Sequence, residues 1–112
     1  MKKTLLFFFL AIAAKSALSQ GTKNSYREKF IEGNHLIIEK NYSLALLYFK
    51  DAYLLDSSSA NIHYKLGVCY LQSGSEKHKA IYHLEKAVQN TTHNYSEEDV
   101  TEKKASEFAY YY

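Results

Sequence analysis

The sequence predicts an all-α fold in which helical hairpins stack on one another. Proline is absent from all 112 residues, so no rigid residue interrupts a helical run. Beyond residue 20, apolar residues recur at steps of three and four, which is the spacing of one helix face. A similar hairpin pattern then occurs twice along the chain. These three observations favour stacked helices over a sheet.

Residues 1–19 are predicted to be a signal peptide. Lys2 and Lys3 precede an apolar run from Leu5 to Ala14, which is shorter than the ~20 residues that span a bilayer. Small residues near its end favour cleavage after Ser19, while the charge of Lys15 leaves an uncleaved anchor as the alternative. We therefore expect the mature chain to be exported.

Removal of this leader changes the charge balance of the chain. Three of the 14 basic residues leave with it, and the remaining 11 face 12 acidic residues, a balance of −1. Phosphate backbones and anionic membranes need a clustered Lys/Arg surface, which this balance and pattern do not provide. Nucleic-acid binding is not expected, and membrane association is expected only through a partner or a missing domain.

The first hairpin is predicted over two helices. The first helix runs from about 25 to 39, with Phe30 on its apolar face and Gly33 beside it, and Asn41 breaks it. The second begins near Ser43, a plausible N-cap, and ends before the polar stretch 56–59. Its apolar residues are Ala45, Leu46, Phe49, Ala52, Tyr53 and Leu55.

The second hairpin repeats the first. A helix over about 60–72 is expected to end at Gly74, which can adopt the left-handed cap, and a further helix follows over about 77–89. From Gly33 to Gly67 the spacing is 34 residues, and the helical positions that follow are spaced by 35. The extra residue is assigned to the turn at 74–79, where a longer loop costs little. The 35-residue pairs are Ala45 and Ala80, Phe49 and Leu84, and Ala52 and Ala87.

After residue 90 the helical pattern lapses into a polar linker over 91–96. Ser96 and the acids after it have the pattern of a capping box, which predicts a fifth helix over 97–112. With aromatic residues at its open end, this helix is expected to be the start of a third repeat that is cut short, and the chain to be part of a larger array.

The pattern over 26–88 resembles the tetratricopeptide repeat, a 34-residue helical hairpin that stacks into a right-handed superhelix. The chain departs from the family at Glu32, Ser57 and His63, where an apolar residue, a proline and a tryptophan are usual. Positions that match the packing pattern of the family are Gly33, Tyr42, Ala45, Phe49, Ala52, Leu66, Gly67, Tyr70, Ala80, Leu84 and Ala87.

With its leader, the layout resembles the N-terminal part of Bacteroidota envelope proteins of the OmpA family, which place such repeats before a peptidoglycan-binding domain. This resemblance implies a scaffold in the periplasm, associated with the outer membrane, that docks a protein or peptide in a concave groove. The alternative is the repeat region of an envelope hydrolase whose catalytic domain lies beyond this chain. Resemblance to peptide-binding members indicates Arg27, Asn34, Ile38, Asn61, Tyr64 and Gln72 as groove contacts, and a solvated inner face is the simpler interpretation of these residues.

Catalytic and metal-binding patterns are not evident. No two of the five histidines are paired at i, i+4 with a carboxylate partner in the pattern that zinc sites use, so no metal or cofactor is expected, and His63 is predicted to pack between repeats. Cys69 lies near Leu66 and Tyr70, a place that suits a small buried side chain. We therefore do not expect an enzyme within these residues.

Overall fold

The structure, a computed structural model, describes residue 21 and residues 23–112, so the predicted signal peptide lies outside the described residues. A helix over 23–38 is followed by α2 (Tyr42–Leu55), α3 (Ala60–Ser73) and α4 (Lys77–Ala87). Over the described part of the chain, the strands are β1 (Thr91–Thr92) and β2 (Ala105–Ser106), of two residues each. The prediction of an all-α fold is confirmed, because helices dominate these residues.

Local chemistry explains most helix ends. The Asn41 side chain accepts a hydrogen bond from the Leu44 amide at 3.4 Å, so Asn41 is the N-cap of α2 and the prediction of Ser43 for that role is wrong. Ser59 caps α3 by accepting from the Ile62 amide at 3.3 Å. Gly74 ends α3 in the left-handed conformation, with φ of 73°.

Each hairpin contains an equivalent close contact between its own two helices. A Cβ added to Gly33 would lie 2.7 Å from Cζ of Phe49, and one added to Gly67 would lie 2.6 Å from Cγ of Leu84. In each hairpin a glycine of the first helix therefore makes room for a large side chain of the second. This equivalence follows the spacing read from the sequence.

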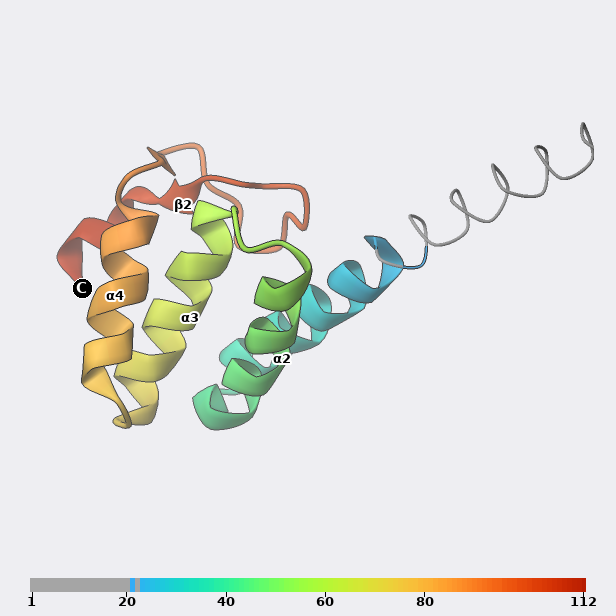
Figure 1. The fold of residues 1–112 in the computed structure, drawn as a ribbon, viewed down its shortest axis with the longest axis horizontal. Helices are drawn as coiled ribbons and strands as arrows, with labels where there is room; N and C mark the ends of the chain where they lie inside the picture. The colour runs from blue at the N-terminus through green and yellow to red at the C-terminus, as the bar shows by residue number, and fades with distance from the viewer. Residues whose placement is uncertain (1–20, 22) are drawn as a thin grey trace, which may run out of the picture.

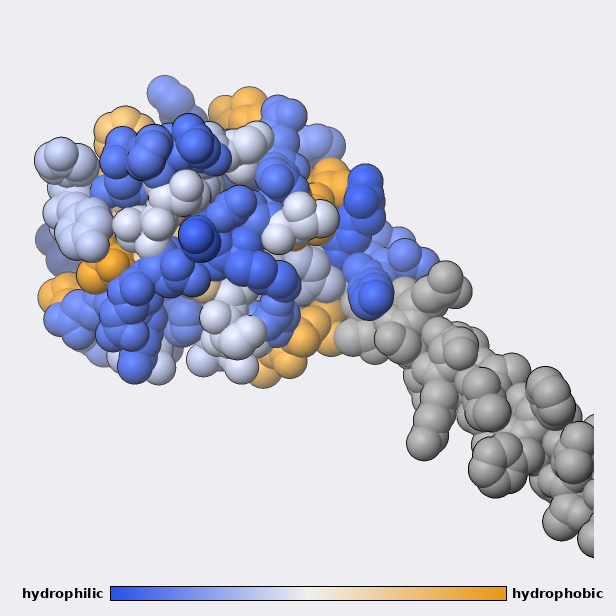
Figure 2. Space-filling view, turned by 90° about the horizontal axis from the view of Figure 1, so that it is seen from above, coloured by the Kyte–Doolittle hydropathy of each residue, from blue (hydrophilic) through white to orange (hydrophobic). Residues whose placement is uncertain are grey.

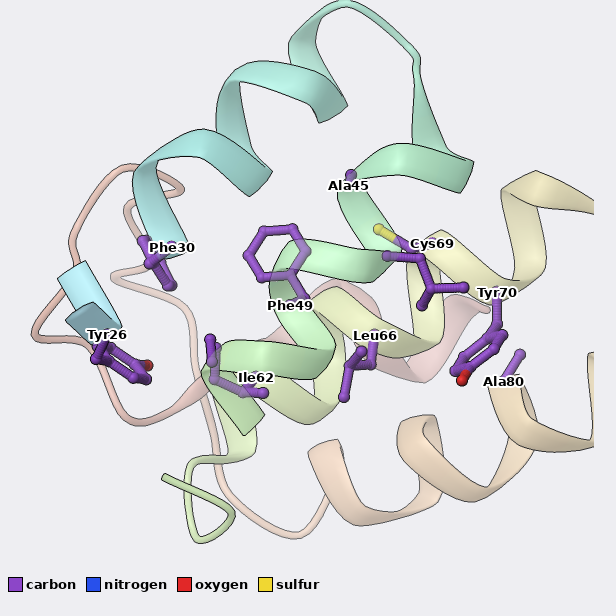
Figure 3. Close-up of a cluster of buried hydrophobic side chains, with 11 residues drawn as sticks. Tyr26, Phe30, Ala45, Phe49, Ile62, Leu66, Cys69, Tyr70 and Ala80 are labelled. Atoms are coloured by element: carbon purple, nitrogen blue, oxygen red, sulfur yellow. The ribbon is translucent and has the colours of Figure 1, made fainter. Parts of the chain in front are cut away.

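The hydrophobic core joins all four helices (Figure 3). Phe49 from α2 lies between Phe30 of the first helix and Leu66 of α3, and the Phe30 and Phe49 rings meet edge to face at 6.0 Å. A second cluster links Tyr64 of α3 to α4 and to the C-terminal segment. In the described range, no helix is long and apolar enough to cross a membrane.

The C-terminal part differs from the sequence prediction. The expected fifth helix over 97–112 does not form; turns and irregular chain lead from residue 93 to β2 and then to the 3₁₀ helix η1 (Glu107–Tyr111). Strand β2 pairs in parallel with β1, Thr91 with Ala105 and Thr92 with Ser106. A 3₁₀ helix and a strand pair therefore replace the start of a third α-helical repeat.

The segment between the two strands crosses the molecule and returns (Figure 1). It leaves the end of α4, passes over the N-terminal end of α3 toward the first helix, and comes back to place η1 beside α4. Viewed from above, this side of the molecule is largely hydrophilic, with hydrophobic residues gathered toward its edges (Figure 2). The path brings polar residues near the C-terminus against both hairpins.

Candidate functional site

The helix over 23–38 and α3 present polar side chains to residues 95–103. We call this surface the inner face and define it by Asn34, Asn61, Tyr64 and Lys65, all of which are buried. Consecutive first helices of the two hairpins supply it, because both turn the same side toward the returning segment. The inner face is therefore the place where the fold offers side-chain groups to an irregular length of chain.

Two asparagines of the inner face hold the backbone of this segment. The Asn34 side-chain amide donates to the Glu97 carbonyl at 2.8 Å, and that of Asn61 donates to the Glu102 carbonyl at 3.2 Å. The Asn61 backbone amide, in the first turn of α3, donates to the Lys103 carbonyl at 3.1 Å, and the Tyr95 hydroxyl donates to the Asn61 side-chain oxygen. Asn61 thus satisfies its buried polar atoms only through residues 95–103.

Lys65 is the charged group of the inner face, and only 2 % of its surface is exposed. Its amine donates to the Glu97 carbonyl at 3.2 Å and also pairs with the Glu97 carboxylate. The rings of Phe30 and Tyr95 each lie 5.6 Å from the amine. Burial lowers the pKa of Lys65, and the Glu97 carboxylate opposes this shift by stabilising the cation.

Tyr95 and Tyr112 cover the Tyr64 ring of the inner face. The Tyr64 ring meets the Tyr95 ring edge to face at 5.8 Å and the Tyr112 ring at 6.2 Å. Burial raises the pKa of both Tyr64 and Tyr95, and the nearby Glu97 carboxylate adds to the shift, so both hydroxyls stay protonated. They act here as packing groups and hydrogen-bonding groups.

Part of the inner face stays open as a cleft of about 340 Å³ beside the segment. Four of the six predicted groove residues line it, namely Asn34, Ile38, Tyr64 and Gln72. Ile38 is 69 % exposed, so the cleft offers apolar surface at its rim. The lining also includes Ile37, Tyr42, Lys65, Val68, Glu97, Glu98 and Tyr112.

The other two predicted groove residues lie elsewhere. Asn61 belongs to the inner face but is buried under the segment. Arg27 lines a separate hollow of about 540 Å³ with Lys23, Tyr26 and the ion pair between Lys103 and Asp56. The expectation that all six residues share one groove is therefore wrong for Arg27, because position 27 lies at the far end of the first helix from the cleft.

The positions predicted to pack the repeats are buried, except Tyr42, which is half-buried. In each hairpin the glycine of the first helix lies against a large side chain of the second helix: Gly33 against Phe49, and Gly67 against Leu84. The buried set comprises Gly33, Ala45, Phe49, Ala52, Leu66, Gly67, Tyr70, Ala80, Leu84 and Ala87.

Sequence analysis missed Lys65, Tyr95, Glu97 and Glu102, which contribute most of the polar contacts to the inner face. One signal was available for Lys65: it shares a helix face with Asn61, four residues earlier, which was itself a candidate. No comparable signal marked Glu97, because its role depends on an irregular path of the chain.

A pair of histidines, His63 and His83, joins α3 to α4. Nδ1 of His63 lies 2.9 Å from Nδ1 of His83, a distance at which one neutral ring donates to the other. Tyr53 of α2 packs edge to face on both rings, and Tyr70 stacks on His83. Burial lowers the pKa of His63, and that of His83 to about 4, with nearby lysines adding to both shifts.

Neither the histidines nor the cysteine form a reactive or metal-binding cluster in the described residues. No group of three or more His, Cys, Asp or Glu side chains converges there in a way that could hold a metal ion. Cys69 is buried, and burial raises the pKa of its thiol to about 12, which keeps the sulfur protonated.

Comparison with known proteins gave no match for this chain among protein-family models, curated proteins or solved structures.

Proposed function

We propose that this chain is a tetratricopeptide-type interaction module of the bacterial cell envelope that binds an extended peptide segment on its inner face. The carrying observation is that Asn34 and Asn61 donate to backbone carbonyls of an irregular segment. Side chains that bind backbone atoms can hold an extended chain of varied sequence. The open cleft beside these bonds gives a ligand room for further contact.

Two features support a repeat module. The equivalent contacts of Gly33 with Phe49 and of Gly67 with Leu84 relate the hairpins as copies of one unit. Consecutive first helices supply the inner face, which is how stacked hairpins build a binding surface. On this proposal the hairpins belong to a right-handed superhelix, and the chain acts by docking a partner rather than by catalysis.

Selection of peptides from a random extended library, with the full chain as bait, tests the proposal. We expect selected peptides to bind the native chain and to lose about tenfold in affinity when Ile38 or Gln72 is changed to Ala, because both line the cleft. The matched controls are Ile81→Ala and Gln89→Ala, which alter exposed residues of the same types outside the cleft. Equal losses in the cleft variants and their controls, or no selected peptide, would refute the docking function.

The compartment is a separate part of the proposal and rests on the sequence of residues 1–19. We expect the mature protein to fractionate with the periplasm or the outer membrane of its host, held there by a partner. Fractionation of cells that express a tagged chain measures this directly. Recovery in the cytoplasm with residues 1–19 intact would contradict the export part and leave peptide binding untouched.

A further inference from the structure

Resting on the proposed function, we infer that residues 95–102 are an internal competitor on the inner face, and that the partner is an acidic peptide segment which displaces them. The native occupant of the inner face is this chain's own segment, which we call the internal segment. Its contacts with the inner face define which chemical groups a partner must supply in order to take its place.

The first requirement is a carboxylate. Lys65 is almost fully buried when the internal segment is in place, and its charge is compensated by Glu97 and by the faces of Phe30 and Tyr95. A cation buried without a counterion costs several kcal/mol. Any chain that covers Lys65 must therefore place an acidic side chain beside the Lys65 amine, which selects acidic ligands over neutral or basic ones.

The second requirement is an aromatic hydroxyl placed two residues before the acid. Tyr95 packs edge to face on Tyr64 and donates to the side-chain oxygen of Asn61, while Glu97 meets Lys65. Backbone carbonyls of the same chain must also reach the amides of Asn34 and Asn61. The inner face thus fits a segment with tyrosine and glutamate separated by one residue, in which the chain turns at the acid, as the hydrogen bond from the Asp99 amide to the Ser96 carbonyl at 3.2 Å shows for the internal segment.

The internal segment is held loosely enough to be displaced. Glu97 pairs with Lys65, yet 62 % of its side chain is exposed, and Ser96, Glu98 and Asp99 are also exposed. Tyr95 and Val100 are the apolar side chains of the internal segment, and both are only partly buried against the core clusters. Irregular chain with so few buried apolar contacts belongs to the less stable part of a fold. By contrast, Ala105 and Ala109 are buried in the second core cluster, so β2 and η1 can stay in place while residues 95–102 leave.

A labelled peptide with the sequence of residues 94–103, added to the full chain, tests the inference. We expect the Glu97→Gln chain to bind this peptide about tenfold more tightly than the native chain, because its own segment no longer neutralises Lys65 and the peptide supplies the missing carboxylate. The same peptide with its glutamate at position 97 changed to glutamine should not bind. Lys65→Met should remove binding in either background.

The matched control is Glu98→Gln, which removes the same charge from the adjacent residue, one that makes no ion pair or side-chain hydrogen bond in the described structure. Circular dichroism shows whether each variant keeps its helices, and Tyr95→Phe is a second way to loosen the internal segment should Glu97→Gln not fold. Equal affinity for the Glu97→Gln and Glu98→Gln chains would overturn the internal competitor.

The two proposals fail in different ways. If library-selected peptides bind through Ile38 and Gln72 while the peptide of residues 94–103 binds no variant, the docking function stands and the competitor falls. If neither kind of peptide binds any variant, both fall. If the Glu97→Gln chain dimerises by exchanging residues 95–102, the occupant is a second copy of this chain and the inference of an acidic partner is overturned.

Discussion

Phe49 packs its ring so closely on Gly33 that a Cβ at position 33 would lie 2.7 Å from Cζ of the ring. Gly67 and Leu84 repeat this relationship in the second hairpin. The Phe49 and Leu84 side chains are both buried, so neither can move away from an added Cβ at low cost.

Replacement of either glycine by alanine is expected to destabilise the protein. Alanine gains about 1 kcal/mol in helix propensity, but overpacking of a core costs about 1–3 kcal/mol, so we expect a net loss of about 1 kcal/mol for Gly33→Ala and for Gly67→Ala. Urea unfolding followed by circular dichroism measures the change. Gly21→Ala is the control, because a Cβ there meets nothing within 4 Å; destabilisation by this variant as well would contradict the packing explanation.

Asn61→Ala is expected to cost about 2–3 kcal/mol of the free energy of unfolding. The substitution removes the donor to the Glu102 carbonyl and leaves the Tyr95 hydroxyl without its acceptor in a buried place. Asn24→Ala, an exposed change in the first helix, should alter stability by less than about 0.5 kcal/mol. Similar unfolding midpoints for the two variants in urea would show that the internal segment does not depend on Asn61.

The histidine pair predicts a loss of stability in mild acid. Because the folded pKa of His83 is about 4, below its ordinary value of 6.5, the unfolded chain binds more protons between these values. Stability is therefore complete above pH 6.5 and decreases as the pH falls toward 4, with His63 contributing in the same direction. Solvent screening at the half-buried His83 ring limits the loss to about 1–2 kcal/mol.

Thermal unfolding at several pH values measures this dependence. His83→Gln should flatten the profile between pH 6.5 and 4, whereas His78→Gln, an exposed histidine on the same helix, should retain it. Asp56 does not confuse the result, since hydrogen bonds from Lys103 and Ser58 outweigh partial burial and lower its pKa beneath 3.8. A profile unchanged by His83→Gln would assign the acid sensitivity to other groups.

The start of α4 offers a stabilising substitution. Glu76 has φ of 54°, a left-handed conformation that costs a non-glycine residue about 1 kcal/mol, and its side chain does not cap the helix. Glu76→Gly should gain about 0.5 kcal/mol after the loss of the exposed pair with Lys79. Glu85→Gly, within α4, should instead lose about 1 kcal/mol. The two variants should shift the melting temperature in opposite directions, and shifts of the same sign would refute the strain at Glu76.

Hydrophobic spacing predicted the four helices to within a few residues, because the buried face of each is determined by local periodicity. Helix α3 extends one residue beyond the predicted helix over 60–72, and Gly74 ends it as expected. The capping-box pattern predicted a helix over residues 97–112, but local helix propensity does not determine the structure of this segment. There, Glu97 binds Lys65 and the Lys103 carbonyl binds Asn61, so long-range contacts override a local preference.

The candidate site was predicted less completely for the same reason. Asn34, Ile38, Tyr64 and Gln72 were identified from the resemblance to peptide-binding repeats and line one cleft. What their neighbours contact depends on the path of residues 93–104, which has no periodicity to follow. The charge at Lys65 therefore had no visible partner in the sequence, although Glu97 compensates it in the fold.

The N-terminal end of α3 has a consequence for the order of folding. Ser59 satisfies the Ile62 amide as soon as the helix forms, but the Asn61 amide finds its acceptor only in the Lys103 carbonyl. While the chain emerges from the ribosome, the first helix, α2 and α3 can assemble early, and the inner face stays uncovered until residue 103 arrives. During that interval the side chains of Asn34, Asn61 and Lys65 are accessible to any molecule present at the site of synthesis.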